Sequence, residues 1–165
     1  MVNNAETRLA AAGIELPSPP APFGAYVPAV QTGNLVFLTG MLPTVGHEAG
    51  FLGRAGKELN AERGRRAAYA AALNVLAVAR QHLGSLDRVS RVVRLGVYIA
   101  TAGDFSDHVT VADAASELLR EIFGEDKISS RLVFGVESLP LGVPVELEVI
   151  FEVSARRAVI AKTLK

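Results

Sequence analysis

The 165-residue chain contains no cysteine, which excludes disulfides, zinc–thiolate sites, iron–sulfur clusters and thiol catalysis by this chain. It also lacks tryptophan, and aromatic residues make up only 6% of it. The 17 basic and 17 acidic side chains cancel, whereas a general nucleic-acid binder usually carries a basic excess. No apolar run is long enough to span a membrane, and the first residues lack the order of a signal peptide. These absences favour a cytoplasmic protein that binds neither membrane nor nucleic acid.

What the chain does have is apolar residues, at 50% of the total. A chain of this length can bury roughly 70% of the surface that it exposes when unfolded, so it needs no covalent staple. We therefore expect a single domain over residues 1–165, with a core at about 15–153 and peripheral extensions at both ends.

The order of the predicted elements indicates an α+β fold. Apolar runs bounded by turn residues predict strands, and apolar residues at helical spacing predict helices. The strands are expected over residues 25–31, 34–39 and 91–100 and twice within 129–153, and the helices over 61–83 and 109–123. The order β-β-α-β-α-β-β predicts two helices packed on one face of a mixed sheet, as in a sandwich.

The first predicted helix has clear end signals. Asn60 can cap its beginning, and Gly84 can end it in a left-handed conformation. Arg63, Arg65 and Arg66 lie in its first turns, where the helix dipole disfavours cations. We interpret these arginines as a solvated outer face.

The predicted sheet has more apolar surface than two helices can cover. Several strands are apolar on both faces, whereas the helices shield only one of them. The second face must therefore meet another surface, which predicts a homo-oligomer with sheets packed against each other.

Charged residues alternate with apolar ones along the last two strands. Successive side chains of a strand point to opposite faces. If the apolar sets of both strands, Leu132 and Phe134 in one and Val145 and its alternating partners in the other, face the helices, then Arg131 and Glu146 lie together on the open face. From the residues alone, a structural ion pair is the favoured interpretation, and a pocket for a small acid is the alternative.

Three segments in order resemble the RidA/YjgF family of reactive-intermediate deaminases. They are A-P-F-G-A-Y-V-P-A-V-Q-T-G-N-L-V-F-L-T-G-M-L-P, D-F-S-D with F-G at the end of the helix that follows, and S-R-L-V-F-G-V-E-S-L-P-L-G-V-P-V-E-L-E-V-I-F-E. The last segment is similar to the family signature of an arginine, Leu-Pro and Val-Glu-x-Glu. The resemblance covers most of residues 15–153 and is closest to a longer YjgF-like branch.

The resemblance implies a chorismate-mutase-like fold, a homotrimer and ligand pockets in the clefts between subunits. It makes Arg131 the residue that binds the substrate carboxylate and Glu146 the residue that positions or activates water. The other substrate-binding positions that it implies are Tyr26, Thr39, Gly40, Met41, Val133 and Ser116. Three positions depart from the family pattern. Met41 stands where a glutamine is common, and Val133 stands where a cysteine or small residue is common. Ser116, with Asp113 nearby, stands where an asparagine is common. These departures alter the pocket wall.

The reaction implied by the resemblance is hydrolysis of an enamine or imine of the 2-aminoacrylate or 2-iminopropionate type to a 2-keto acid and ammonia. It needs no metal or cofactor, because a protonated imine is already electrophilic. The expected partner is a small imine, enamine or keto acid that bears a carboxylate. A non-catalytic keto-acid sensor is the first alternative. Endoribonuclease activity is weaker, given the zero net charge, and a chorismate-mutase-like reaction rests on fold alone.

Overall fold

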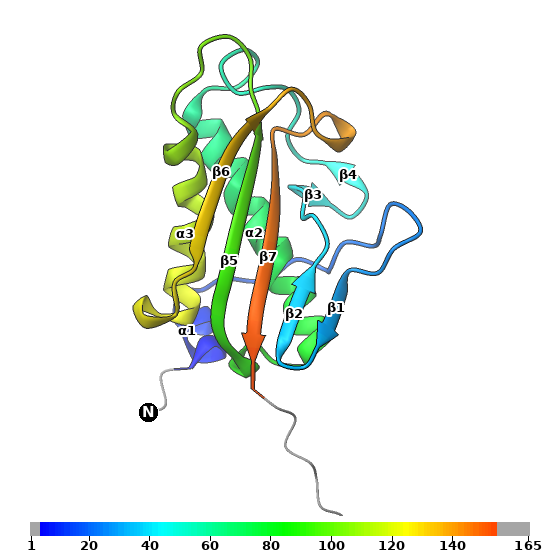
Figure 1. The fold of residues 1–165 in the computed structure, drawn as a ribbon, viewed down its shortest axis with the longest axis vertical. Helices are drawn as coiled ribbons and strands as arrows, with labels where there is room; N and C mark the ends of the chain where they lie inside the picture. Colours follow the sequence, from blue (N-terminus) through cyan, green and yellow to red (C-terminus); the bar gives the residue numbers. More distant parts are fainter. Residues whose placement is uncertain (1–3, 155–165) are drawn as a thin grey trace, which may run out of the picture.

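The computed structural model describes residues 4–154; the predicted C-terminal extension, from residue 155, lies outside the described residues. Helices and strands follow each other along the chain in the order shown in Figure 1. The helices are α1 (Ala5–Ala11), α2 (Ala61–Leu83) and α3 (His108–Phe123), with 3-10 turns η1 (Leu86–Arg88), η2 (Glu125–Lys127) and η3 (Pro140–Gly142). The strands are β1 (Ala29–Thr32), β2 (Leu35–Leu38), β3 (Thr44–Val45), β4 (Glu48–Ala49), β5 (Val89–Ala100), β6 (Ser130–Val136) and β7 (Val145–Val153).

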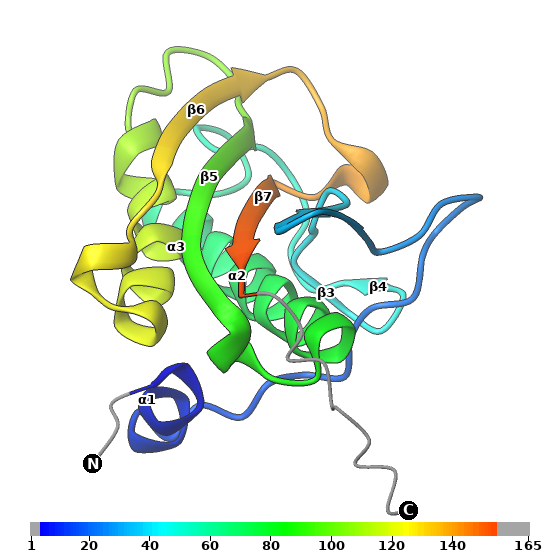
Figure 2. The ribbon, with the colours of Figure 1, turned by 60° about the horizontal axis from the view of Figure 1, so that its bottom comes forward.

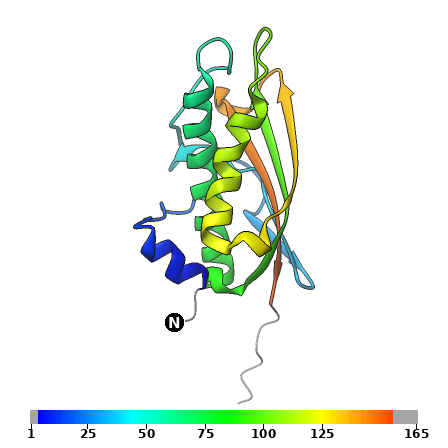
Figure 3. The same cartoon turned by 90° about the vertical axis from the view of Figure 1, so that its left-hand side faces the viewer.

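Five of the strands form one mixed sheet in the order β1-β2-β7-β5-β6. The pairing of β5 with β6 is parallel, and the other pairings are antiparallel. Seen from the side, the helices lie on one face of this sheet and leave the other face open (Figure 3). The predicted α+β arrangement is therefore confirmed.

Helix α2 begins and ends where its sequence signals place it. The Asn60 side chain accepts a hydrogen bond from the Arg63 backbone N–H at 2.9 Å, and Gly84 adopts a left-handed φ of 82°. The small side chains Ala68, Ala71 and Ala72 are fully buried, so the helix approaches the sheet closely. Helix α1 packs beside α3 at the lower end of the helix layer (Figure 2).

The strands β3 and β4 form a small second sheet that the sequence did not predict. Each strand has only two residues, and glycines surround them. Asn74 of α2, 1% exposed, holds this loop by donating hydrogen bonds to the carbonyls of Leu42 at 2.8 Å and Thr44 at 3.0 Å. A buried amide without these acceptors would be costly, so the contact fixes the loop on the helix.

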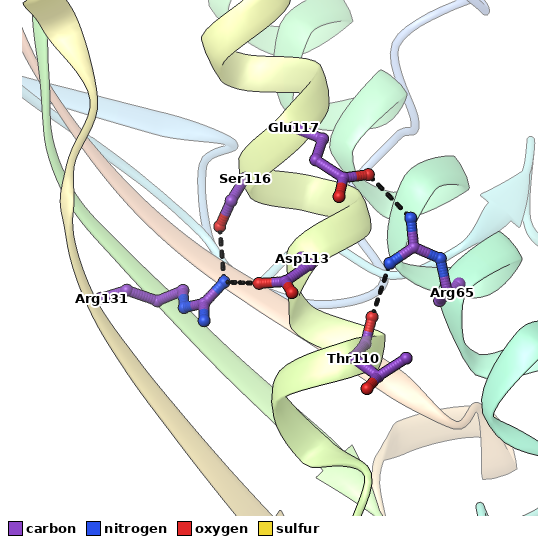
Figure 4. A network of polar contacts seen from close by, with 6 residues as sticks. All are labelled: Arg65, Thr110, Asp113, Ser116, Glu117 and Arg131. Atoms are coloured by element: carbon purple, nitrogen blue, oxygen red, sulfur yellow. Dashed lines mark hydrogen bonds and ion pairs between the residues drawn. The ribbon is translucent and has the colours of Figure 1, made fainter. Parts of the chain in front are cut away.

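The face assignment predicted for β6 is wrong. In β7, Val145, Leu147 and the alternating residues that follow are buried against the helices, as expected. In β6, however, Arg131 pairs with the fully buried Leu95 of β5 and therefore faces the helices, whereas Phe134 pairs with Tyr98 and faces outward. Figure 4 shows Arg131 reaching from β6 to α3.

The physical reason for this error is the apolar character of the open face. Leu132 and Phe134 are 41% and 48% exposed, and Val30 and Phe37 of the hairpin are exposed on the same side. Phe134 stacks on Tyr98 with ring centroids 6.1 Å apart. Apolar residues on β6 therefore do not mark the helix side, because this edge strand carries Leu132 and Phe134 on the uncovered face as well as Val133 on the helix side.

Candidate functional site

Arg131 is held on the helix side of the sheet by two residues of α3 (Figure 4). Its Nη1 donates to Oδ1 of Asp113 at 2.7 Å and to Oγ of Ser116 at 2.9 Å. Asp113 and Ser116 are three positions apart, so they lie on the same face of the helix. Since an ion pair fixes the guanidinium on one edge, its other N–H groups remain oriented for a ligand.

A cavity of about 340 Å³ opens beside this arginine, between α3 and the beginning of β6. It is lined by Asp113, Ser116, Glu117, Leu119, Arg120, Ile128, Ser129 and Arg131. The lining combines a charged cluster with apolar side chains, a composition typical of sites for small molecules.

The second acid on this stretch of α3 does not compete for Arg131. Glu117 accepts a hydrogen bond from Nη2 of Arg65 on α2 at 2.7 Å, and Arg65 also donates to the Thr110 carbonyl at 2.8 Å. Figure 4 shows the Glu117 carboxylate turned toward α2. The interpretation of Arg65 as a solvated residue is therefore corrected: it joins the two helices.

A second group of predicted site residues gathers at the other side of the sheet, where β2 ends. Tyr26, Thr39, Gly40 and Met41 line a small depression of about 20 Å³. The Tyr26 hydroxyl accepts a hydrogen bond from the backbone N–H of Phe23 at 2.9 Å, which fixes the ring at the surface.

Glu146 lies against this second group. A Cβ added at Gly40 would overlap the Glu146 carboxylate, so any larger residue there would displace this carboxylate from its present position. Burial raises the pKa of the Glu146 carboxyl above its ordinary value of 4.5. A carboxyl with a raised pKa is a better proton acceptor than an ordinary surface glutamate.

The predicted catalytic pair is not brought together within one chain. Arg131 faces the helices from β6, whereas Glu146 lies on the open face of β7, where its strand neighbours Val145 and Leu147 point to the core. Strand β5 lies between β6 and β7. The structure thus divides the predicted site residues into an arginine half (Arg131, Val133, Ser116) and a glutamate half (Tyr26, Thr39, Gly40, Met41, Glu146).

Two departures from the family pattern have different surroundings. Val133 is half-buried on the same side of β6 as Arg131 and packs against the core. Met41 is only 2% exposed, and its backbone pairs with that of Leu147 in both directions, at 2.8 and 2.9 Å. Met41 therefore contributes mainly packing to the floor of the depression.

Sequence reasoning missed two contacts near the site. It placed Asp113 only in the vicinity, although this residue binds Arg131 directly. It also assigned no contact to Tyr98, whose hydroxyl donates to Glu148 at 3.3 Å on the open face. Burial, and then the charge of Glu148, raise the pKa of Tyr98. Neither contact has a sequence signal, because both depend on how separate elements pack.

Comparison with known proteins places nearly all of the described chain in a single family. The model of the family described as "YjgF/chorismate mutase-like, putative endoribonuclease" matches residues 6–152. Protein TCP17 of Trypanosoma cruzi is 36% identical over 143 residues, which cover 86% of this chain and 89% of that protein.

Solved structures agree with this match. A Shewanella oneidensis protein with the same endoribonuclease description is 31% identical and superposes with a TM-score of 0.87 over 92% of this chain and all of that one. Escherichia coli TdcF, solved with bound serine, is 25% identical and superposes with a TM-score of 0.59 over 86% of this chain and 98% of that one.

Among the described residues, no helix is long and apolar enough to cross a membrane.

Proposed function

Because the chain belongs to the YjgF/chorismate-mutase-like family, we propose that it hydrolyses small enamines or imines bearing a carboxylate to 2-keto acids and ammonia. The observation that carries this proposal is the position of Arg131 beside a cavity of about 340 Å³. Residues of α3 hold its guanidinium through Nη1 alone. The bound serine of TdcF supports an amino-acid-like ligand for a relative of this chain.

The reaction follows from the two halves of the site. An enamine first tautomerises to the imine, whose carboxylate accepts hydrogen bonds from the Arg131 guanidinium. Glu146 takes a proton from water as the water oxygen bonds to the imine carbon, giving a carbinolamine. Glu146 then returns its proton to the nitrogen and the carbon–nitrogen bond breaks, so that nitrogen leaves as ammonia. The hydroxyl proton passes to the ammonia, and the carbon retains the oxygen as a keto group. With one charge-assisted anchor, a substrate this small binds weakly, with a Kd of roughly 1 mM.

The division of the site supports a catalytic cleft between two copies of the chain. Arg131 and Glu146 lie on opposite faces of one sheet, so a cleft containing both needs the arginine half of one protomer and the glutamate half of another. The exposed apolar residues Phe37, Leu132 and Phe134 supply a surface for this association. A closed homotrimer forms three such clefts by repeating one contact.

The proposal is tested by imine hydrolysis. A pyridoxal-phosphate-dependent dehydratase generates 2-aminoacrylate from serine, and pyruvate release is followed with and without this protein. We expect the protein to accelerate pyruvate release beyond the spontaneous rate, without added metal or cofactor. If the rate is unchanged while carboxylates still bind through Arg131, the deaminase proposal fails for this substrate and a keto-acid sensor is favoured.

Endoribonuclease activity is the second candidate, because the matching family description carries that word. The described site offers a carboxylate anchor and a glutamate, but its lining charges, Asp113, Glu117, Arg120 and Arg131, cancel. A groove for a polyanion needs a basic excess. Incubation with a labelled single-stranded RNA tests this candidate directly, and cleavage that survives Arg131→Ala would separate it from the imine site.

A further inference from the structure

The arginine half contains an acid whose presence a simple carboxylate anchor does not explain. Asp113 pairs with Arg131 at 2.7 Å, yet its side chain is 41% exposed, compared with 24% for Arg131. It lines the same cavity as the arginine. A negative charge beside the anchor repels a ligand that is only an anion, so Asp113 should weaken binding of such a ligand.

The Asp113 carboxylate also has a free acceptor position. In residues 4–154, its hydrogen bond to Arg131 uses Oδ1, and no hydrogen bond uses Oδ2. The neighbouring Glu117 is occupied by Arg65 and faces α2. Asp113 is therefore the acid of α3 that combines an unused oxygen with access to the space beside Arg131.

We propose that Arg131 and Asp113 together recognise the zwitterionic head group of an α-amino or α-iminium acid: Arg131 binds its carboxylate, and Asp113 accepts a hydrogen bond from its cationic nitrogen. This inference assigns Asp113 a role in ligand selectivity and rests on the proposed function. In such a head group the nitrogen and the carboxylate are bonded to the same carbon, so Arg131 and Asp113, which are in direct contact, can bind both groups of one ligand. Ser116 accepts the second hydrogen bond of Nη1 and thereby keeps the guanidinium in place.

The arrangement distinguishes substrate from product. A protonated 2-imino acid carries the cationic N–H that Asp113 accepts, whereas the 2-keto acid formed from it has only a carboxylate and a carbonyl. The keto acid gains nothing from Asp113 and is repelled by it. Hydrolysis thus removes the group that holds the ligand, and product leaves.

The test compares two stable ligands that differ at the nitrogen, L-alanine and pyruvate. Their binding to the full-length protein is measured by NMR titration for wild type and Asp113→Asn, which keeps an oxygen for Arg131. We expect wild type to bind alanine about three- to tenfold more tightly than pyruvate, the range of a partly exposed charged contact. Asp113→Asn should weaken the binding of alanine, strengthen the binding of pyruvate and bring the ratio of the two Kd values near one. Glu121→Gln, an exposed acid on the same helix outside this cavity, is the matched control and should keep the wild-type ratio.

Each other outcome overturns the inference. If Asp113→Asn strengthens the binding of both ligands equally, Asp113 only competes with ligand carboxylates for Arg131. If it lowers the melting temperature without changing the ratio, the pair with Arg131 is structural. Absence of saturable alanine binding by wild type also contradicts the inference. None of these measurements needs turnover, so a failed hydrolysis assay with an intact alanine preference would reject only the proposed reaction.

Discussion

The two faces of the sheet differ in whether their candidate site charge has a partner of opposite charge. On the helix side, Arg131 has its partners within the chain, at 2.7 and 2.9 Å. On the open side, Glu146 is partly buried. Burial raises its pKa, and no cation contributes an opposing shift. The charge of Arg131 is thus paired before any ligand binds, whereas burial disfavours the charged form of Glu146. Under the proposed function, ligand binding and proton transfer would therefore be prepared on separate surfaces, which a second chain would have to join.

The largest effect is expected when the glutamate half loses its base. Glu146→Gln should lower the rate constant for imine hydrolysis by about 10²–10³-fold, because a positioned base contributes a factor of that order. Carboxylate affinity should remain within about twofold of wild type, since Arg131 is unchanged. Stopped-flow measurement of pyruvate release and NMR titration with a carboxylate provide the two readouts.

The matched control is Glu152→Gln, on the same face of the same strand, where the substituted amide keeps an oxygen for the Asn34 side chain at 2.9 Å. Equal losses in both variants would mean that the open face matters through its total charge, and the role of Glu146 as a base would be abandoned.

The next effect concerns the arginine half. Arg131→Ala should weaken carboxylate binding by roughly 10–100-fold, because it removes charge-assisted hydrogen bonds and leaves Asp113 uncompensated. Arg131→Lys should restore only part of the affinity, since an ammonium cannot present two parallel N–H groups. Arg66→Ala, an exposed arginine of α2, serves as control. Unchanged affinity in Arg131→Ala would remove this residue from the site.

A smaller but more specific effect tests whether the halves come from different chains. When the inactive Arg131→Ala and Glu146→Gln proteins are unfolded together and refolded as a 1:1 mixture, random assembly gives about one quarter of the clefts both native residues. We therefore expect about one quarter of the wild-type activity per cleft. If mixing recovers no activity while size-exclusion chromatography shows mixed oligomers, each site is built within one chain.

The smallest effect is on stability and its pH dependence. A carboxyl whose pKa is raised in the folded state binds protons more tightly there than in the unfolded chain, so its contribution to folding weakens as pH rises from about 4.5 through the folded pKa. Glu146→Gln should therefore raise the melting temperature at pH 7 by roughly 1–3 °C and have less effect at pH 4. Calorimetry at the two pH values checks the difference. A lower melting temperature at pH 7 would show that the native carboxylate is stabilised by contacts that outweigh its desolvation.

The extent to which the sequence predicts this molecule depends on the range of the interactions involved. The ends of α2 were predictable because Asn60 and Gly84 act within one turn of the chain. The face of β6 was not, since it depends on the parallel register that sets Arg131 opposite Leu95, and apolar residues line both sides of that strand. The candidate site residues were predicted from family resemblance. Their division into two halves, and the pair of Arg131 with Asp113 eighteen positions away, required the packed helix and sheet.

The contact between Gly40 and Glu146 has a consequence for how this surface tolerates change. Gly40 needs no left-handed φ, so the chain could accept another residue there without backbone strain. A larger side chain would instead meet the Glu146 carboxylate, which would have to move. A library of substitutions at this position would therefore separate folding from activity. Alanine and serine at position 40 should yield folded protein with a displaced Glu146 carboxylate. The shorter acid in Glu146→Asp should compensate by relieving the overlap with the new side chain.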